Sequence, residues 1–88
     1  MARLLLYTSV GCHLCEQAQL EVEPWLRHYG LELVAVEIAD SDELVERYGV
    51  RIPVVQLEGA TQDLGWPFDT VVLRRYLDSA LADTGPTR

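Results

Sequence analysis

The order of apolar segments in the first forty residues constrains the fold of this chain most strongly. Leu4–Thr8 form a short apolar run, as expected of a strand that is buried on both faces. A helical pattern follows from about His13 to Tyr29, and a second strand pattern runs from Leu31 to Ile38. A strand, a helix and a strand in this order form a crossover unit, so the two strands should pair in parallel beneath the helix.

The rest of the chain predicts shorter elements. They are a helix over 43–48 after a capping cluster at 40–42, a strand over 52–57, a turn at 58–60, a return strand over 61–64 and a last helix from Asp69 or Thr70 to Leu81. The order β-α-β-α-β-β-α predicts an α/β fold, with a four-stranded mixed sheet and helices on both faces. The strand at 31–38 is apolar on both sides, so we expect it in the centre of the sheet.

The length allows one domain, which we place at residues 1–83, with a flexible C-terminal tail at 84–88. Within the helices, apolar residues at spacings of three and four mark the faces that should pack on the sheet. These inward positions include Leu14 in the first helix, Val45 in the second and Val72 in the third.

The only two cysteines occur as Cys12-His13-Leu14-Cys15, where the first strand meets the first helix. Free amides and the positive end of the dipole at a helix N-terminus stabilise a thiolate, which is the attacking species in disulfide exchange. We therefore expect Cys12 to be the nucleophile and Cys15, one turn later, the resolving thiol. His13 would strengthen this effect when protonated, or it has no role; the sequence leaves both open.

Other chemistries fit the sequence less well. A zinc site needs four ligands, and Cys12, His13 and Cys15 offer three at best, so we expect no mononuclear metal; a cluster shared between two chains stays open. Fourteen acidic residues against seven arginines give a net charge of −7, which disfavours nucleic acid as a partner. No stretch is long enough to span a membrane, and we expect a cytoplasmic protein without membrane contacts.

Three segments resemble the short glutaredoxin-like proteins of the thioredoxin superfamily. They are Tyr7–Cys15, Arg51–Val55 and Gly65–Asp69. The resemblance implies a thioredoxin-like fold of the glutaredoxin type and a cis peptide bond between Ile52 and Pro53. In that geometry, the backbone amide and carbonyl of Ile52 would pair with an extended substrate beside Cys12.

The chain also departs from the glutaredoxin pattern. Glutaredoxins carry a lysine or arginine before the first cysteine, whereas this chain has Ser9 there and contains no lysine. Trp66 replaces the second glycine of the family's glycine pair and is either a ligand-facing wall or ordinary packing. Asp69 either meets the amine of glutathione or caps the last helix. We therefore expect weak glutathione binding and no permanently bound cofactor.

The leading hypothesis is a monomeric dithiol oxidoreductase that reduces protein or mixed disulfides and is itself reduced by a dithiol donor. One alternative is an iron–sulfur cluster carrier, in which two chains would hold a cluster through Cys12 and glutathione. A second alternative is a binding module that keeps the fold without catalytic turnover. Brown colour on anaerobic purification would favour the carrier. A biological effect that survives replacement of both cysteines would favour the binding module.

Overall fold

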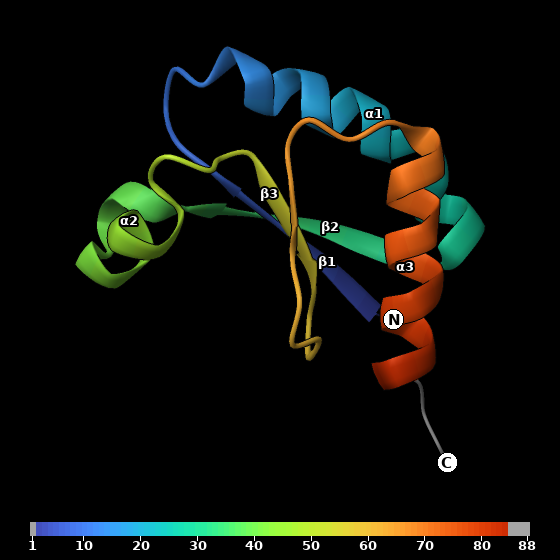
Figure 1. Ribbon diagram of the computed structural model, residues 1–88. Helices are drawn as coiled ribbons and strands as arrows, with labels where there is room; N and C mark the ends of the chain where they lie inside the picture. The colour runs from blue at the N-terminus through green and yellow to red at the C-terminus, as the bar shows by residue number, and fades with distance from the viewer. Residues whose placement is uncertain (1, 85–88) are drawn as a thin grey trace.

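The computed structural model describes residues 2–84 and forms an α/β fold (Figure 1). Its elements are β1 (Ala2–Thr8), α1 (His13–Tyr29), β2 (Leu31–Glu37), a 3-10 turn η1 (Ile38–Asp40), α2 (Asp42–Tyr48), β3 (Val54–Leu57), β4 (Leu64–Gly65) and α3 (Thr70–Thr84). The predicted fold class is confirmed, and the bounds of α1 agree with the helix predicted from the sequence. The short turn η1 was not predicted.

The four strands form one mixed sheet in the order β2-β1-β3-β4. β1 is central, pairing in parallel with β2 and antiparallel with β3, while β4 returns antiparallel to β3. The prediction that residues 31–38 form a central strand is wrong, because β2 is an edge strand. Its two apolar faces have another cause: Leu33 packs against the main core on one side and Val36 against a smaller cluster on the other.

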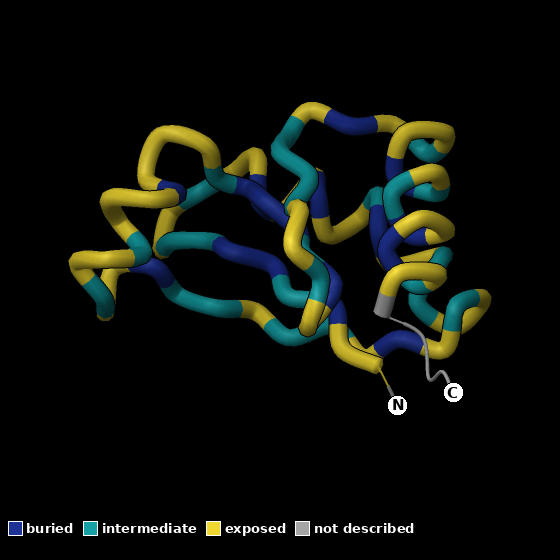
Figure 2. Tube along the Cα trace, turned by 60° about the horizontal axis from the view of Figure 1, so that its bottom comes forward, coloured by how far each residue is buried: buried dark blue, intermediate teal, exposed yellow. Residues whose placement is uncertain are grey.

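Two apolar clusters hold the layers together. The larger cluster lies between the sheet and the helices α1 and α3, which cover the same face (Figure 1). Its buried side chains include Leu4, Leu6, Ala18, Val22, Val55, Leu57, Leu73 and Leu77. The smaller cluster joins the opposite face to α2 through Tyr7, Ile38, Tyr48 and Val54. In Figure 2 the buried residues accordingly follow the strands and the inner sides of the helices.

Three apolar positions that were predicted to face inward are instead exposed. Leu14 is 47% exposed, Val45 45% and Val72 42%. Each lies next to the residue that begins the buried face of its helix. Cys15, not Leu14, continues to buried Ala18 and Val22 in α1, and Leu73, not Val72, continues to buried Leu77 in α3. The apolar spacing was therefore a correct guide to most of the buried face, but it included a neighbouring position that points outward.

The return strand lies later than predicted, at Leu64–Gly65 rather than 61–64. The segment before it is held instead by side chains, because Arg51 binds Asp63 and the Tyr76 hydroxyl donates to the Gln62 carbonyl at 2.6 Å. At the C-terminus, Thr84 ends α3, and the remainder of the predicted tail lies outside the described residues. Among residues 2–84, none of the helices combines the length and apolarity needed to cross a bilayer.

Candidate functional site

Cys12 and Cys15 form a disulfide at the start of α1, with their Cα atoms 5.3 Å apart. Cys12 occupies the cap position before the helix, and its Sγ accepts a hydrogen bond from the amide of Cys15 at 3.2 Å. The amide of Cys12 donates to the carbonyl of Ser9, also at 3.2 Å, while Gly11 turns the chain with a φ of 83°. Cys15 is buried and Cys12 is half-buried, so an incoming reagent reaches Cys12 more easily.

The strand register brings several predicted site residues to the same end of the sheet as this disulfide. Tyr7 lies opposite Val54, so the end of β1 adjoins Pro53 at the start of β3. On the far side of β3, the amide of Trp66 donates to the carbonyl of Pro53 at 3.0 Å. Figure 1 shows the β1–α1 and α2–β3 loops leaving the sheet at this one end.

Ile52 and Pro53 have the backbone geometry that the family resemblance implies, with one difference. The peptide bond between them is cis, and Pro53 is buried. However, the amide of Ile52 donates to the carbonyl of Tyr48 at 3.0 Å, in the turn that ends α2. The expectation that this amide binds a substrate backbone is therefore wrong for this structure, and only the carbonyl of Ile52 can serve in that way.

Asp69 and Trp66 both make structural contacts. The Oδ1 of Asp69 accepts a hydrogen bond from the amide of Val72 at 2.9 Å, which caps α3. Trp66 is half-buried, packs against the main core and meets the ring of Phe68 edge-on at 5.0 Å. Of the two predicted roles for each residue, the structure supports helix capping for Asp69 and packing for Trp66. The bond between Trp66 and Pro67 is also cis, which the sequence did not indicate.

Arg51 is the cation nearest in sequence to Ile52, but its side chain is already paired with Asp63. Its guanidinium forms a two-point contact with Asp63, at 2.6 and 3.2 Å, and lies over the ring of Tyr48. Hydrogen bonding to Asp63 raises the pKa of Arg51 above its ordinary value. Ser9 carries no charge, and the carboxylate of Asp69 is engaged in the cap of α3.

A hollow of about 180 Å³ adjoins the disulfide. Its walls come from the end of β1, the first turns of α1 and the edge strand β2, and its lining residues are Leu6, Thr8, Ser9, Gly11, Cys12, Cys15, Glu16, Gln19 and Ala35. Of the predicted site residues, Ser9 and both cysteines line it, whereas His13 is exposed at the first position of α1. Sequence reasoning missed Glu16, Gln19 and Ala35, because the pairing of Ala35 with Leu6 and the packing of α1 beside these strands bring them together.

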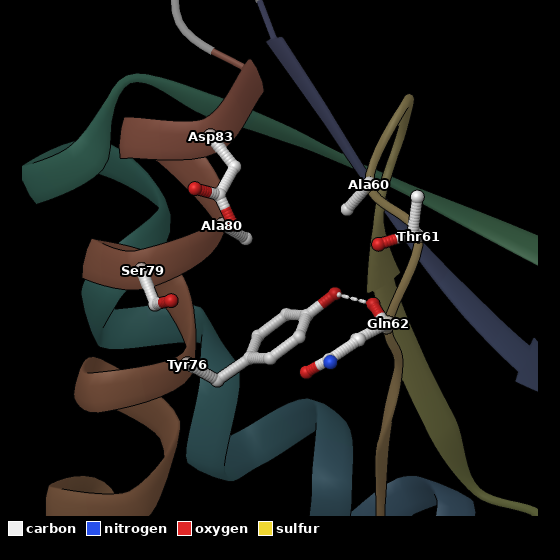
Figure 3. Close-up of a pocket in the computed structure, with 7 residues that line it drawn as sticks. All are labelled: Ala60, Thr61, Gln62, Tyr76, Ser79, Ala80 and Asp83. Atoms are coloured by element: carbon white, nitrogen blue, oxygen red, sulfur yellow. Dashed lines mark hydrogen bonds between the residues drawn. The ribbon is translucent and has the colours of Figure 1, made fainter.

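A second hollow, of about 170 Å³, lies at the opposite end of the sheet (Figure 3). It separates the connection after β3, at Ala60–Gln62, from the last turns of α3. Tyr76 reaches across it, donating to the Gln62 carbonyl and accepting from the amide of Leu57 at 3.0 Å. These bonds give Tyr76 a structural role, and the hollow is remote from the disulfide. Nowhere in residues 2–84 do three or more His, Cys, Asp or Glu side chains gather as a metal site would require.

Two tyrosines stack beneath the site on the α2 face of the sheet. The rings of Tyr7 and Tyr48 lie 4.1 Å apart, and both hydroxyls donate to Oε1 of Gln56. Burial, followed by the interaction with Tyr48, raises the pKa of Tyr7 to about 12. The Tyr7 phenol is therefore neutral at physiological pH, and both hydroxyls act as structural hydrogen-bond donors to Gln56.

Comparisons with known proteins agree with this geometry. The family profile described as "Glutaredoxin-like domain (DUF836)" matches residues 3–78. The X-ray structure of target protein XcR50 from X. campestris is 39% identical, with a TM-score of 0.70 over 88% of this chain and 97% of that one. Its solution structure gives 40% identity and a TM-score of 0.69, over 91% and 96% of the two chains. A malarial protein shares the fold alone, at 16% identity and a TM-score of 0.65 over 92% and 98%. A search of curated proteins finds no match.

Proposed function

The chain belongs to the glutaredoxin-like domain family, and from this premise we propose that it is a thiol–disulfide oxidoreductase that reduces protein or mixed disulfides. The observation that carries the proposal is the asymmetry of the Cys12–Cys15 pair. One sulfur caps the helix and is half-buried, while the other is buried one turn later. A structural staple gains less from such a short loop than from a long one, whereas an exchange reaction needs one accessible and one protected sulfur.

The reaction consists of two exchange steps. In the reduced protein, the Cys12 thiolate attacks one sulfur of the substrate disulfide, a mixed disulfide forms, and the other substrate sulfur leaves as a thiolate that takes up a proton. The Cys15 thiolate then attacks Sγ of Cys12, which re-forms the Cys12–Cys15 disulfide and releases the second substrate thiol. The substrate gains two electrons and the protein loses two.

The start of α1 favours Cys12 as the attacking sulfur. Its Sγ accepts the amide hydrogen bond of Cys15, and the same bond would stabilise a thiolate at that place. Cys15 is positioned by the first helical turn, so its sulfur needs no chain movement to reach Cys12. Ser9 holds the loop through its carbonyl, which fixes Cys12 relative to β1.

We propose that the oxidised protein is reduced by a dithiol donor rather than by glutathione. Ser9 offers only a neutral hydroxyl where glutaredoxins offer a cation, and Arg51 is already paired with Asp63. Glutathione is an anion, so the net charge of −7 further disfavours its approach. We also propose that the protein acts as a monomer, since both sulfurs of the reaction belong to one chain.

Trapping of the mixed disulfide tests this function. Cys15→Ser should stop the reaction after the first step and accumulate a covalent adduct through Cys12 with a disulfide-bearing substrate such as insulin. Cys12→Ser is the matched control and should form no adduct, although it also keeps one thiol. The proposal fails if neither variant forms an adduct while the reduced native protein leaves insulin intact, or if Cys12→Ser forms the adduct instead.

A further inference from the structure

We infer that the hollow beside the disulfide gives the protein a preference for substrates that carry a basic side chain next to the reactive cysteine. This inference rests on the proposed function and adds a substrate class to it. Both cysteines line the hollow, so a substrate whose disulfide reaches Cys12 places its neighbouring residue close to it. In this proposal the residues that line the hollow contact that neighbouring residue.

The shape of the hollow suits one long side chain. Ala35 forms part of its wall on the edge strand β2 and is exposed, so the hollow opens to solvent past a methyl group. Leu6 and Cys15 are buried within it and offer apolar contact to the methylene groups of a side chain. Thr8, Ser9 and Gln19 add polar groups at its walls. A lysine or arginine side chain, with an apolar stem and a charged end, matches this combination.

The charge of the hollow selects a cation. Glu16 is its only charged lining residue, and neither an ion pair nor a hydrogen bond occupies its side chain within the described part of the chain. Glu37 ends β2 opposite Thr8, and Asp40 follows in η1, so further carboxylates surround this end of the sheet. Arg51 is paired instead with Asp63, which directly precedes β4 at the opposite edge of the sheet from β2.

Glu16 also lies in the first turn of α1, where a negative charge stabilises any helix. Stabilisation of the helix by Glu16 would change the reduction rates of all substrates by the same factor. Glu43 provides the matched comparison, because it too is an acidic residue in the first turn of a helix, α2, but does not line the hollow. Glu43→Gln therefore controls for the loss of one negative charge, and the ratio of two peptide rates removes any effect of Glu16 on α1 that is common to all substrates.

The experiment uses two synthetic peptides, each a symmetric dimer linked by one cystine, with arginine or glutamine directly before the cysteine. The reduced native protein should reduce the arginine peptide about two- to fivefold faster at low ionic strength, the range expected for one solvent-accessible ion pair. Glu16→Gln should remove most of this preference and Glu43→Gln should keep it. Added NaCl should weaken it in the native protein.

A second variant tests the shape without changing the charge. Ala35→Phe fills the hollow at an exposed strand position, where an aromatic residue is well tolerated. It should also abolish the arginine preference, measured as the ratio of the rates for the arginine and glutamine peptides. Equal native rates for arginine and glutamine, or an equal loss of preference in Glu16→Gln and Glu43→Gln, would overturn this inference alone. Failure of the reduced native protein to reduce either peptide would overturn the proposed function and this inference with it.

Discussion

Replacement of Asp69 by alanine separates the two roles that its place in the sequence allows. The variant loses the 2.9 Å hydrogen bond from the amide of Val72 to Oδ1 and leaves that amide without its cap. The backbone bond from the Leu73 amide to the carbonyl of Asp69, also 2.9 Å, does not depend on the side chain and should remain. One cap bond is therefore lost while the helix keeps its first backbone bond.

Loss of an aspartate cap costs about 1 kcal/mol in typical helices. We expect the full value here, since α3 contributes buried Leu73 and Leu77 to the main core and cannot fray without exposing them. In a domain of this size that corresponds to a fall in Tm of about 4–8 °C. Asp69→Asn keeps the acceptor and should recover most of the loss.

The assay is urea denaturation of the oxidised protein, together with the rate of insulin reduction per folded molecule. Asp69→Ala should lower the free energy of unfolding and leave that rate unchanged. If Asp69→Ala instead retained full stability and lost glutathione-coupled activity, Asp69 would be a ligand residue and the capping account would be refuted.

Three further predictions follow from the site. Iodoacetamide should alkylate Cys12 before Cys15 in the reduced protein, because Cys12 is the more accessible and lies at the helix start; peptide mapping that found Cys15 modified first would reverse the two roles. Ser9→Lys should raise the glutathione-dependent rate about tenfold by adding a charge-assisted contact, whereas a native rate equal to that of an ordinary glutaredoxin would show that no cation is missing. Since the pKa of Tyr7 is raised from 10.0 to about 12, its burial contributes stability that is complete below pH 10 and is lost as the pH rises towards 12. Urea denaturation of the oxidised protein should therefore show that the free energy of unfolding falls less between pH 9 and 11.5 in Tyr7→Phe than in the native chain. An equal fall in both proteins would contradict this link between Tyr7 and stability.

Local patterns in the sequence were sufficient for much of the fold. The bounds of α1 followed from apolar spacing and from the stop at Gly30, whose φ of 66° suits glycine. The place of Cys12 at a helix start also followed, since a strand, a tight turn at Gly11 and a helix occur in direct succession. These features depend on neighbouring residues alone.

Features that depend on strands pairing across the chain could not be predicted in the same way. β2 has the composition of a central strand, but it pairs with β1 alone and therefore lies at the edge of the sheet. The hollow with Glu16 and Ala35 depends on that same pairing and on the packing of α1 beside it. The hydrogen bond from Ile52 to Tyr48 depends on how the chain leaves α2, which the family resemblance did not specify.

The central claim is that Cys12 and Cys15 form a catalytic couple rather than a structural bond, and a redox titration tests it most directly. The oxidised protein would be equilibrated with dithiol buffers of graded potential, and the fraction of free thiol measured by alkylation and mass. We predict a reversible two-electron transition between about −180 and −270 mV, the range of disulfide isomerases, glutaredoxins and thioredoxin. A disulfide that stays oxidised below about −300 mV, as structural disulfides do, would contradict the account.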